Sequence, residues 1–74
     1  MEPHVEIMVS ELAELEGRIA RLEKFIDSNP IYKTLEKEEQ KDMFAQCLAM
    51  AQYAKFLKRR VERATKQWVS FAPP

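Results

Sequence analysis

Apolar residues between positions 5 and 26 recur at alternating intervals of three and four residues. The positions are Val5, Met8, Leu12, Leu15, Ile19, Leu22 and Ile26. This spacing places every one of these side chains on one face of an α-helix, as at the a and d positions of a coiled coil. Pro3 lies just before this segment, where its missing N–H costs no helical hydrogen bond. We therefore predict a first helix from about residue 4 to about residue 27.

The segment 27–30, with the sequence Asp-Ser-Asn-Pro, is expected to end this helix. The residue before a proline is pushed out of the α region, and Asp, Ser and Asn favour turns. Residues 31–35 then predict a single short helical turn that directs Ile31, Tyr32 and Leu35 inward.

A second long helix is predicted from about residue 37 to about residue 69. Acidic residues at 36, 38 and 39 suit the positive end of its dipole. Its apolar residues again alternate by three and four, at Cys47, Met50, Ala54, Leu57, Val61, Ala64 and Trp68. An adjacent stripe widens this surface and consists of Met43, Phe44, Leu48, Ala51, Tyr53 and Phe56. A helix this broadly apolar is expected to contact more than one neighbour.

Together these elements predict an all-α fold, an antiparallel helical hairpin with a short connecting helical turn, as a single domain over residues 1–74. The helices would be roughly 35 and 50 Å long at 1.5 Å per residue, so the second extends past the first. The residues without cover would be Val61, Ala64, Trp68 and Phe71. A chain this short has a thin core, and its single cysteine excludes an intramolecular disulfide. A homo-oligomer is the expected source of cover.

The net charge of zero hides an uneven distribution. Residues 1–40 contain ten acidic and five basic side chains, whereas residues 41–74 contain two acidic and seven basic ones. One interpretation pairs an acidic first helix with a basic second helix. The other is an anion-binding site made from clustered cations. The two clusters are Arg18, Arg21 and Lys24 near the end of the first helix, and Lys58, Arg59, Arg60, Arg63 and Lys66 on the second.

No arrangement of residues predicts catalysis. The sequence has no Ser/His/Asp or Cys/His set at workable positions, no phosphate loop and no pair of inward carboxylates, so we expect a binding protein and not an enzyme. Cys47 lies in an apolar stripe, where a structural thiol is expected. One histidine, His4, and one cysteine cannot supply a zinc site, so neither a metal nor a cofactor is expected.

The first nine residues include Glu2, Pro3, His4 and Glu6 where a signal peptide would need an apolar core. The apolar runs are also too short for a membrane span. We therefore expect a cytoplasmic protein with no membrane partner.

Four motifs, taken in order, resemble those of small phage helical-hairpin proteins, the anti-CBASS cyclic-oligonucleotide sponges. They are Leu15-x-x-Arg18-Ile19-x-x-Leu22-x-Lys24-Phe25-Ile26, Ile31-Tyr32-x-x-Leu35, Glu38-Glu39-Gln40 and Leu48-x-Met50-x-x-Tyr53-x-x-x-Leu57-x-x-Arg60-Val61. The resemblance covers about positions 9 to 63. It implies a homohexamer in the host bacterial cytoplasm that sequesters cyclic dinucleotides, and in some members cyclic trinucleotides, without degrading these second messengers.

The resemblance also implies ligand-binding residues. The lysine that contacts a cyclic-dinucleotide phosphate matches Lys24. An aromatic residue that stacks on a base early in the first helix has no match, because this chain has Met8, Val9 and Leu12 there.

For a trinucleotide site, the resemblance implies a hydroxyl after the first helix and an arginine late in the second. The hydroxyl matches Ser28. The arginine matches Arg63, with Arg60 as a rival.

Two other functions remain open on sequence grounds. A coiled-coil-like interaction protein would bind a host or phage protein through the uncovered apolar surface. A DNA- or RNA-binding protein would use the basic second helix, but a sequence pI of about 6.6 lacks the usual basic character, so no nucleic-acid polymer is expected as a partner.

Overall fold

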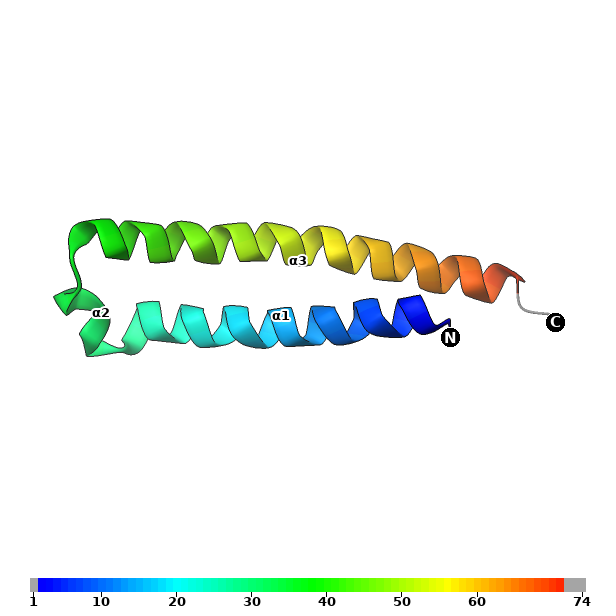
Figure 1. The fold of residues 1–74 in the computed structure, drawn as a ribbon, viewed down its shortest axis with the longest axis horizontal. Helices are drawn as coiled ribbons and strands as arrows, with labels where there is room; N and C mark the ends of the chain where they lie inside the picture. The colour runs from blue at the N-terminus through cyan, green and yellow to red at the C-terminus, as the bar shows by residue number, and fades with distance from the viewer. Residues whose placement is uncertain (1, 72–74) are drawn as a thin grey trace.

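The computed structural model describes the backbone of residues 2–71 and the side chains of residues 2–66. Helix α1 spans Pro3–Ser28, α2 spans Pro30–Thr34, and α3 spans Lys37–Phe71. The two long helices lie antiparallel, and α2 connects them at one end of a rod measuring 58 × 16 × 15 Å (Figure 1). The all-α helical hairpin expected from the sequence is confirmed.

One residue, Asn29, ends α1 and begins α2. Its backbone N–H donates to the carbonyl oxygen of Phe25 at 3.1 Å, and its Oδ1 accepts the N–H of Ile31 at 2.9 Å. The second bond is an N-cap, which satisfies a donor that has no partner within the helix. Pro30 follows in the first turn of α2, where a missing N–H is tolerated. The sharp turn after α1 is therefore specified locally.

Two side chains tie α2 to the beginning of α3. The Tyr32 hydroxyl donates to the carbonyl oxygen of Gln40 at 3.1 Å, and the Gln40 amide donates to the carbonyl oxygen of Leu35 at 2.8 Å. The expectation that Ile31 also points inward is wrong, because its side chain is 56% exposed. A five-residue helix offers only one side to the hairpin, and the half-buried Tyr32 and Leu35 occupy that side.

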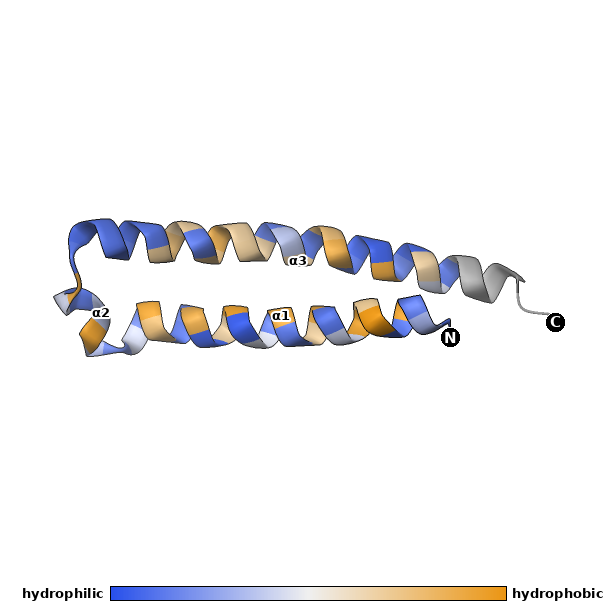
Figure 2. Ribbon diagram, in the orientation of Figure 1, coloured by the Kyte–Doolittle hydropathy of each residue, from blue (hydrophilic) through white to orange (hydrophobic). Residues whose placement is uncertain are grey.

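The core lies where the two predicted stripes face each other (Figure 2). Leu57 is 1% exposed, Val5 is 2% exposed and Leu15 is 7% exposed. The remaining stripe residues with described side chains are half-buried, and Trp68 lies outside the described side chains. A core of three fully buried residues is thin, as expected for so short a chain.

The uncovered part of α3 is shorter than the sequence suggested. Val61 and Ala64, which were expected to lack cover, are half-buried. The reason is that α1 reaches roughly 39 Å against roughly 52 Å for α3, and this difference is divided between the two ends of the rod, so only part of it projects past the beginning of α1 (Figure 1). At the turn end, Phe44, seven residues into α3, shares a groove with Asp27 at the end of α1. The side chains of Trp68 and Phe71 in that projection lie outside the described ones.

Large apolar side chains also remain exposed at several places along the hairpin. They are between 39% and 67% exposed and comprise Ile7, Val9, Ile31, Phe44, Leu48, Tyr53 and Phe56. Four of them belong to the adjacent stripe predicted on the second helix, of which only Met43 is half-buried in the hairpin. The single hairpin therefore does not satisfy its own apolar pattern.

The predicted pairing of an acidic and a basic helix is not realised as direct ion pairs. Among the side chains of residues 2–66, a basic nitrogen lies within 4.0 Å of a carboxylate oxygen in one pair, His4 Nδ1 and Glu2 Oε2 at 3.4 Å. No lysine or arginine in this range comes that close to a carboxylate. Exposed ion pairs contribute little to stability, so their absence costs the fold little. The cations of both basic clusters are available to other charges.

Neither a membrane span nor a metal site is visible in the part of the chain that the structure describes. None of the described helices is long and apolar enough to cross a bilayer. The described residues also contain no group of three His, Cys, Asp or Glu side chains placed to hold a metal ion.

Candidate ligand-binding site

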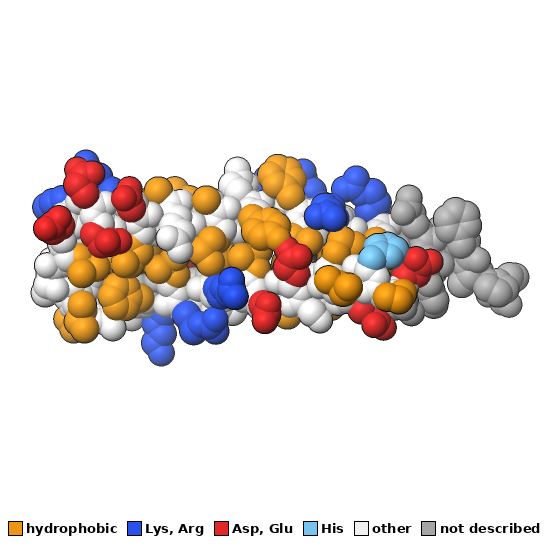
Figure 3. Space-filling model, viewed as in Figure 1, with side chains coloured by type: hydrophobic (Ala, Val, Ile, Leu, Met, Phe, Trp, Pro, Cys, Tyr) orange, Lys and Arg blue, Asp and Glu red, His pale blue; other side chains and the backbone are white. Residues whose placement is uncertain are grey.

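An open pocket of about 350 Å³ lies at the end of α1, where the chain turns into α2. Its lining residues are Arg21, Lys24, Phe25, Ser28, Asn29 and Pro30. Basic side chains gather here along the outer edge of α1 (Figure 3). The pocket therefore combines two cations, an aromatic ring and polar groups within three turns of chain.

Arg21 and Lys24 are three residues apart, so their side chains leave neighbouring turns on the same face of α1. Both side chains are exposed, and neither contacts a carboxylate among the described residues. Two adjacent cations without an internal partner favour an anion from outside.

Ser28 and Asn29 form the polar edge of this pocket. The Ser28 hydroxyl donates to the carbonyl oxygen of Lys24 at 2.8 Å, and Asn29 Oδ1 is occupied by the N–H of Ile31. Ser28 can still accept a hydrogen bond, but donating to a ligand would require it to release the Lys24 carbonyl. The Asn29 Nδ2 group has no partner among the described residues, so it is free to donate.

Phe25 forms the apolar wall of the pocket and was not singled out from the sequence. Its ring is held edge-to-face against Tyr32, with centroids 6.3 Å apart and planes at 89°. Such a pair adds about 0.5–1.5 kcal/mol beyond the buried area. Its position directly after Lys24, and four residues after Arg21, is the sequence signal that could have identified it.

A second basic pocket, of about 300 Å³, lies on the opposite half of the rod and is lined by Arg59, Glu62, Arg63 and Lys66. Arg63 therefore lines this pocket, whereas Arg60 is exposed but is not among its lining residues. The Arg59 guanidinium lies over the Phe56 ring, 5.5 Å from its centroid. This contact holds an exposed aromatic ring beside the cations.

One hairpin does not bring together the residues matched to the trinucleotide site. Asp27, next to Ser28, shares a groove with Phe44, and Arg63 lies 19 positions further along α3. Ser28 and Arg63 are therefore separated by roughly 30 Å at 1.5 Å per residue. A ligand that contacts both must lie between different protomers.

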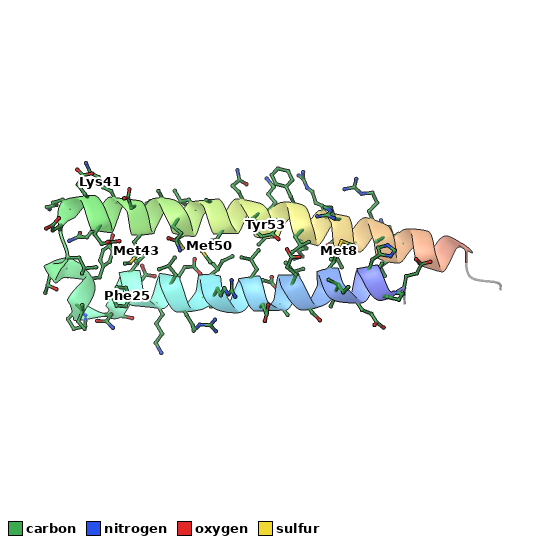
Figure 4. The ribbon with its side chains drawn as sticks, in the orientation of Figure 1. Met8, Phe25, Lys41, Met43, Met50 and Tyr53 are labelled. Carbon is green, nitrogen blue, oxygen red and sulfur yellow. The ribbon has the colours of Figure 1, made fainter. Side chains whose placement is uncertain are left out.

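The residues matched at the beginning of α1 are also far from the Lys24 pocket of the same chain. Met8 and Leu12 are half-buried, Met8 lies between the long helices, and only Val9 is largely exposed, at 39% (Figure 4). Leu12 lies roughly 18 Å along the helix from Lys24. Within one protomer, none of these three side chains reaches the Lys24 pocket.

Comparison with known proteins identifies the family. The family model described as Sequestin matches residues 2–63, which include α1, α2, most of α3 and every residue of the Lys24 pocket. The chain belongs to the Sequestin family. No curated protein and no solved structure gave a match to this sequestin.

Sequestins are a phage family of cyclic-nucleotide sponges. Membership indicates that this chain sequesters a signalling molecule and does not convert it. The phage sponge family suggested by the sequence motifs is confirmed at this level.

The one cysteine of this sequestin lies in a groove on the other side of the hairpin. The groove measures about 120 Å³ and is lined by Glu23, Ile26, Asp27, Phe44, Cys47 and Leu48. Burial raises the pKa of the Cys47 thiol above its ordinary value of 9.0, and the negative charges of Glu23 and Asp27 raise this pKa further. The neutral thiol is therefore favoured, as expected for a structural cysteine.

We expect Cys47 to react more slowly with a thiol reagent at pH 8 in the folded protein than in the guanidinium-unfolded chain. The thiolate is the nucleophile, and folding disfavours it. Because the folded pKa is the higher one, the thiol has no effect on the free energy of unfolding well below pH 9 and lowers it as pH rises above 9. The absorbance of the thiolate that the reagent releases measures both rates. Equal rates in the folded and unfolded chains would contradict the raised pKa of Cys47.

Proposed function

We propose that this sequestin binds and sequesters the cyclic dinucleotide and/or cyclic trinucleotide second messengers of bacterial CBASS immunity, in the host cytoplasm and without degrading them. The observation that carries the proposal is the pocket at the end of α1, where Lys24 and Arg21 lie side by side without internal partners. A cyclic oligonucleotide carries one negative charge on each phosphodiester, which matches such a site. The pocket also lies within the region that defines the family.

We further propose that the active form is a homo-oligomer, in keeping with the hexamer expected for this group. Two features support this. Residues expected to contact the same ligand are far apart in one hairpin, roughly 18 Å between Leu12 and Lys24 and roughly 30 Å between Ser28 and Arg63 along the rod. The apolar surface that includes Phe44 and Leu48 is more than half exposed on the single chain. Packing of several hairpins would cover this surface and bring cations from different chains to one ligand.

For a trinucleotide, the proposed contacts are the Ser28 hydroxyl and Arg63, with Arg60 as the rival arginine. The second basic pocket supports Arg63, because Arg63 lines it and Arg60 does not. For a dinucleotide, Lys24 is the proposed phosphate contact. Met8, Val9 and Leu12 would offer an apolar surface to a base from another protomer, with Val9 the most exposed of the three.

The alternative is a coiled-coil-like interaction protein that binds a host or phage protein. The exposed apolar surface favours it, since a patch of this kind marks either a subunit interface or a partner site. A thermal-shift panel of cyclic dinucleotides and trinucleotides separates the two functions. A ligand present at 100 times its Kd stabilises the folded state by about 2.7 kcal/mol, whereas the interaction protein would show no shift with any of them.

Lys24→Ala should weaken cyclic-dinucleotide binding by about 1.5–3 kcal/mol, the range for a hydrogen bond to a charged group. Isothermal titration calorimetry measures the loss, and Lys33→Ala, which removes an exposed cation outside the described pockets, is the matched control. Oligomer size should be the same for both variants. Equal affinities for the two variants would remove Lys24 from the site.

A further inference from the structure

Two residues of the Lys24 pocket, Arg21 and Phe25, have not been assigned a contact with a particular part of the ligand. Both line the same open pocket as Lys24, and both lie within one turn of it on α1. A phosphodiester bound to Lys24 would therefore lie close to both side chains. The inference that follows rests on the proposed function and concerns the same site.

Arg21 is placed to share an anion with Lys24. One of its guanidinium nitrogens, Nη1, lies 3.4 Å from the position that a Cβ on Gly17 would take, so the side chain runs back along α1 over a residue without a side chain. No described carboxylate holds the guanidinium there, and it is free to turn toward the pocket. A guanidinium binds two phosphate oxygens at once, whereas a lysine ammonium acts as a point charge.

Phe25 supplies an aromatic surface at the place where the cations are. The first four turns of α1 contain no aromatic residue, and Phe25 is the one aromatic ring in the wall of this pocket. Its edge-to-face contact with Tyr32 fixes the ring before any ligand arrives. A ring held in this way can support a nucleobase by stacking, which is worth about 1–3 kcal/mol per base and requires little base specificity.

We propose that Arg21 is a second phosphate-binding residue beside Lys24, and that Phe25 is the aromatic surface that supports the attached base. The pocket then takes one nucleotide unit of the ligand, the phosphodiester against Arg21 and Lys24 and the base against Phe25. Each protomer supplies one such pocket for one nucleotide. The remaining nucleotides of the cyclic ligand lie against other chains of the assembly.

The test uses two probes with three variants of the full chain. Pyrophosphate has phosphate oxygens but no base, and its binding is followed through the backbone amide resonances of residues 24–29. Cyclic GMP–AMP has both phosphate and base, and its affinity is measured by calorimetry. The variants are Arg21→Ala, Phe25→Leu and Arg18→Ala. Arg18 is the matched control, because it is an exposed arginine one turn earlier that does not line the pocket.

We expect Arg21→Ala to weaken both probes at least tenfold, and Phe25→Leu to weaken cyclic GMP–AMP at least fivefold while leaving pyrophosphate within twofold. Arg18→Ala should change neither probe by more than about twofold, since an exposed charge outside the pocket is screened by salt. A Phe25→Leu change that acted only by loosening the turn would weaken both probes together, and that result would overturn the role of the ring. Equal losses in Arg18→Ala and Arg21→Ala would overturn the role of Arg21.

The same data separate this inference from the proposed function. If the wild-type chain binds pyrophosphate through Arg21 but no cyclic dinucleotide or trinucleotide, the proposed function is wrong and the two-cation anion site stands. If cyclic GMP–AMP binds with an affinity that neither Arg21→Ala nor Phe25→Leu alters, the function stands and this inference is wrong. Binding of neither probe by the wild-type chain would overturn this inference, and a failure to bind any cyclic trinucleotide as well would overturn the proposed function.

Discussion

Leu57→Ala is expected to lower the free energy of unfolding by about 2–5 kcal/mol, the range for removing a buried leucine side chain from a core. Leu57 is 1% exposed and is the most completely buried residue of the described chain. A core with only three fully buried residues has few contacts to compensate for the cavity. Total stabilities of small domains are only about 5–15 kcal/mol, so this one substitution removes a large share.

Urea denaturation followed by circular dichroism measures the effect. Leu57→Met is the matched control, because it keeps the volume and the apolar character and should cost less than about 1.5 kcal/mol. If Leu57→Ala unfolds at the same urea concentration as the wild type, the two long helices do not pack through this position and the hairpin core is assigned wrongly.

Leu48→Glu is expected to dissociate the assembly. Leu48 is 56% exposed on the single hairpin, next to Phe44, and both line a groove that already contains the carboxylates of Glu23 and Asp27. A third carboxylate in a covered interface would be desolvated among like charges, which is strongly unfavourable. The helices should persist, because Leu48 contributes little to the core of its own chain.

Light scattering measures this change as a fall toward the mass of one chain, 8.7 kDa. Ala13→Glu adds the same charge at an exposed position of α1 outside the apolar surface, and it should leave the mass of the assembly unchanged. A wild-type protein that is itself monomeric would contradict the proposed assembly, whatever the variants do.

The pattern of apolar residues was sufficient to predict the long helices and their contact. The alternation of three and four between Val5 and Ile26 has a physical meaning only on a helix, and the structure buries that face. The pattern was misleading for Ile31, because apolar character alone does not show which side of a single helical turn faces the hairpin. The opposite net charges of the two halves did not predict how the helices contact each other. The long helices lie side by side, but no lysine or arginine pairs with a carboxylate among the described side chains.

The candidate site could be predicted only in part. Lys24 and Ser28 were named through a resemblance, and the structure places them in one pocket. Arg21 was counted only as a member of a basic cluster, and Phe25 only as part of a motif, because the sequence does not show which side chains a turn gathers around a pocket. A site made by residues of different protomers cannot be assembled from a sequence pattern or from the structure of a single hairpin.

The separation of functions along the rod gives a physical account of how so small a chain could act as a sponge. The turn end holds a pocket with two cations and a fixed aromatic ring, and the opposite half holds a second basic pocket beside an exposed ring, Phe56. The apolar surface between them is available for packing against other copies. Each surface can then be altered without removing the others, which makes the account testable one residue at a time.

The central claim, that this sequestin holds a cyclic nucleotide without converting it, is tested most directly by recovering the ligand after binding. The protein is incubated with cyclic GMP–AMP and cyclic tri-AMP, separated from free nucleotide by gel filtration and denatured, and the released nucleotide is analysed by chromatography. The account predicts that at least one of them elutes with the protein and is returned as the intact ring. Release of a linear product, or the absence of bound nucleotide in the protein fraction at concentrations well above micromolar, would contradict it.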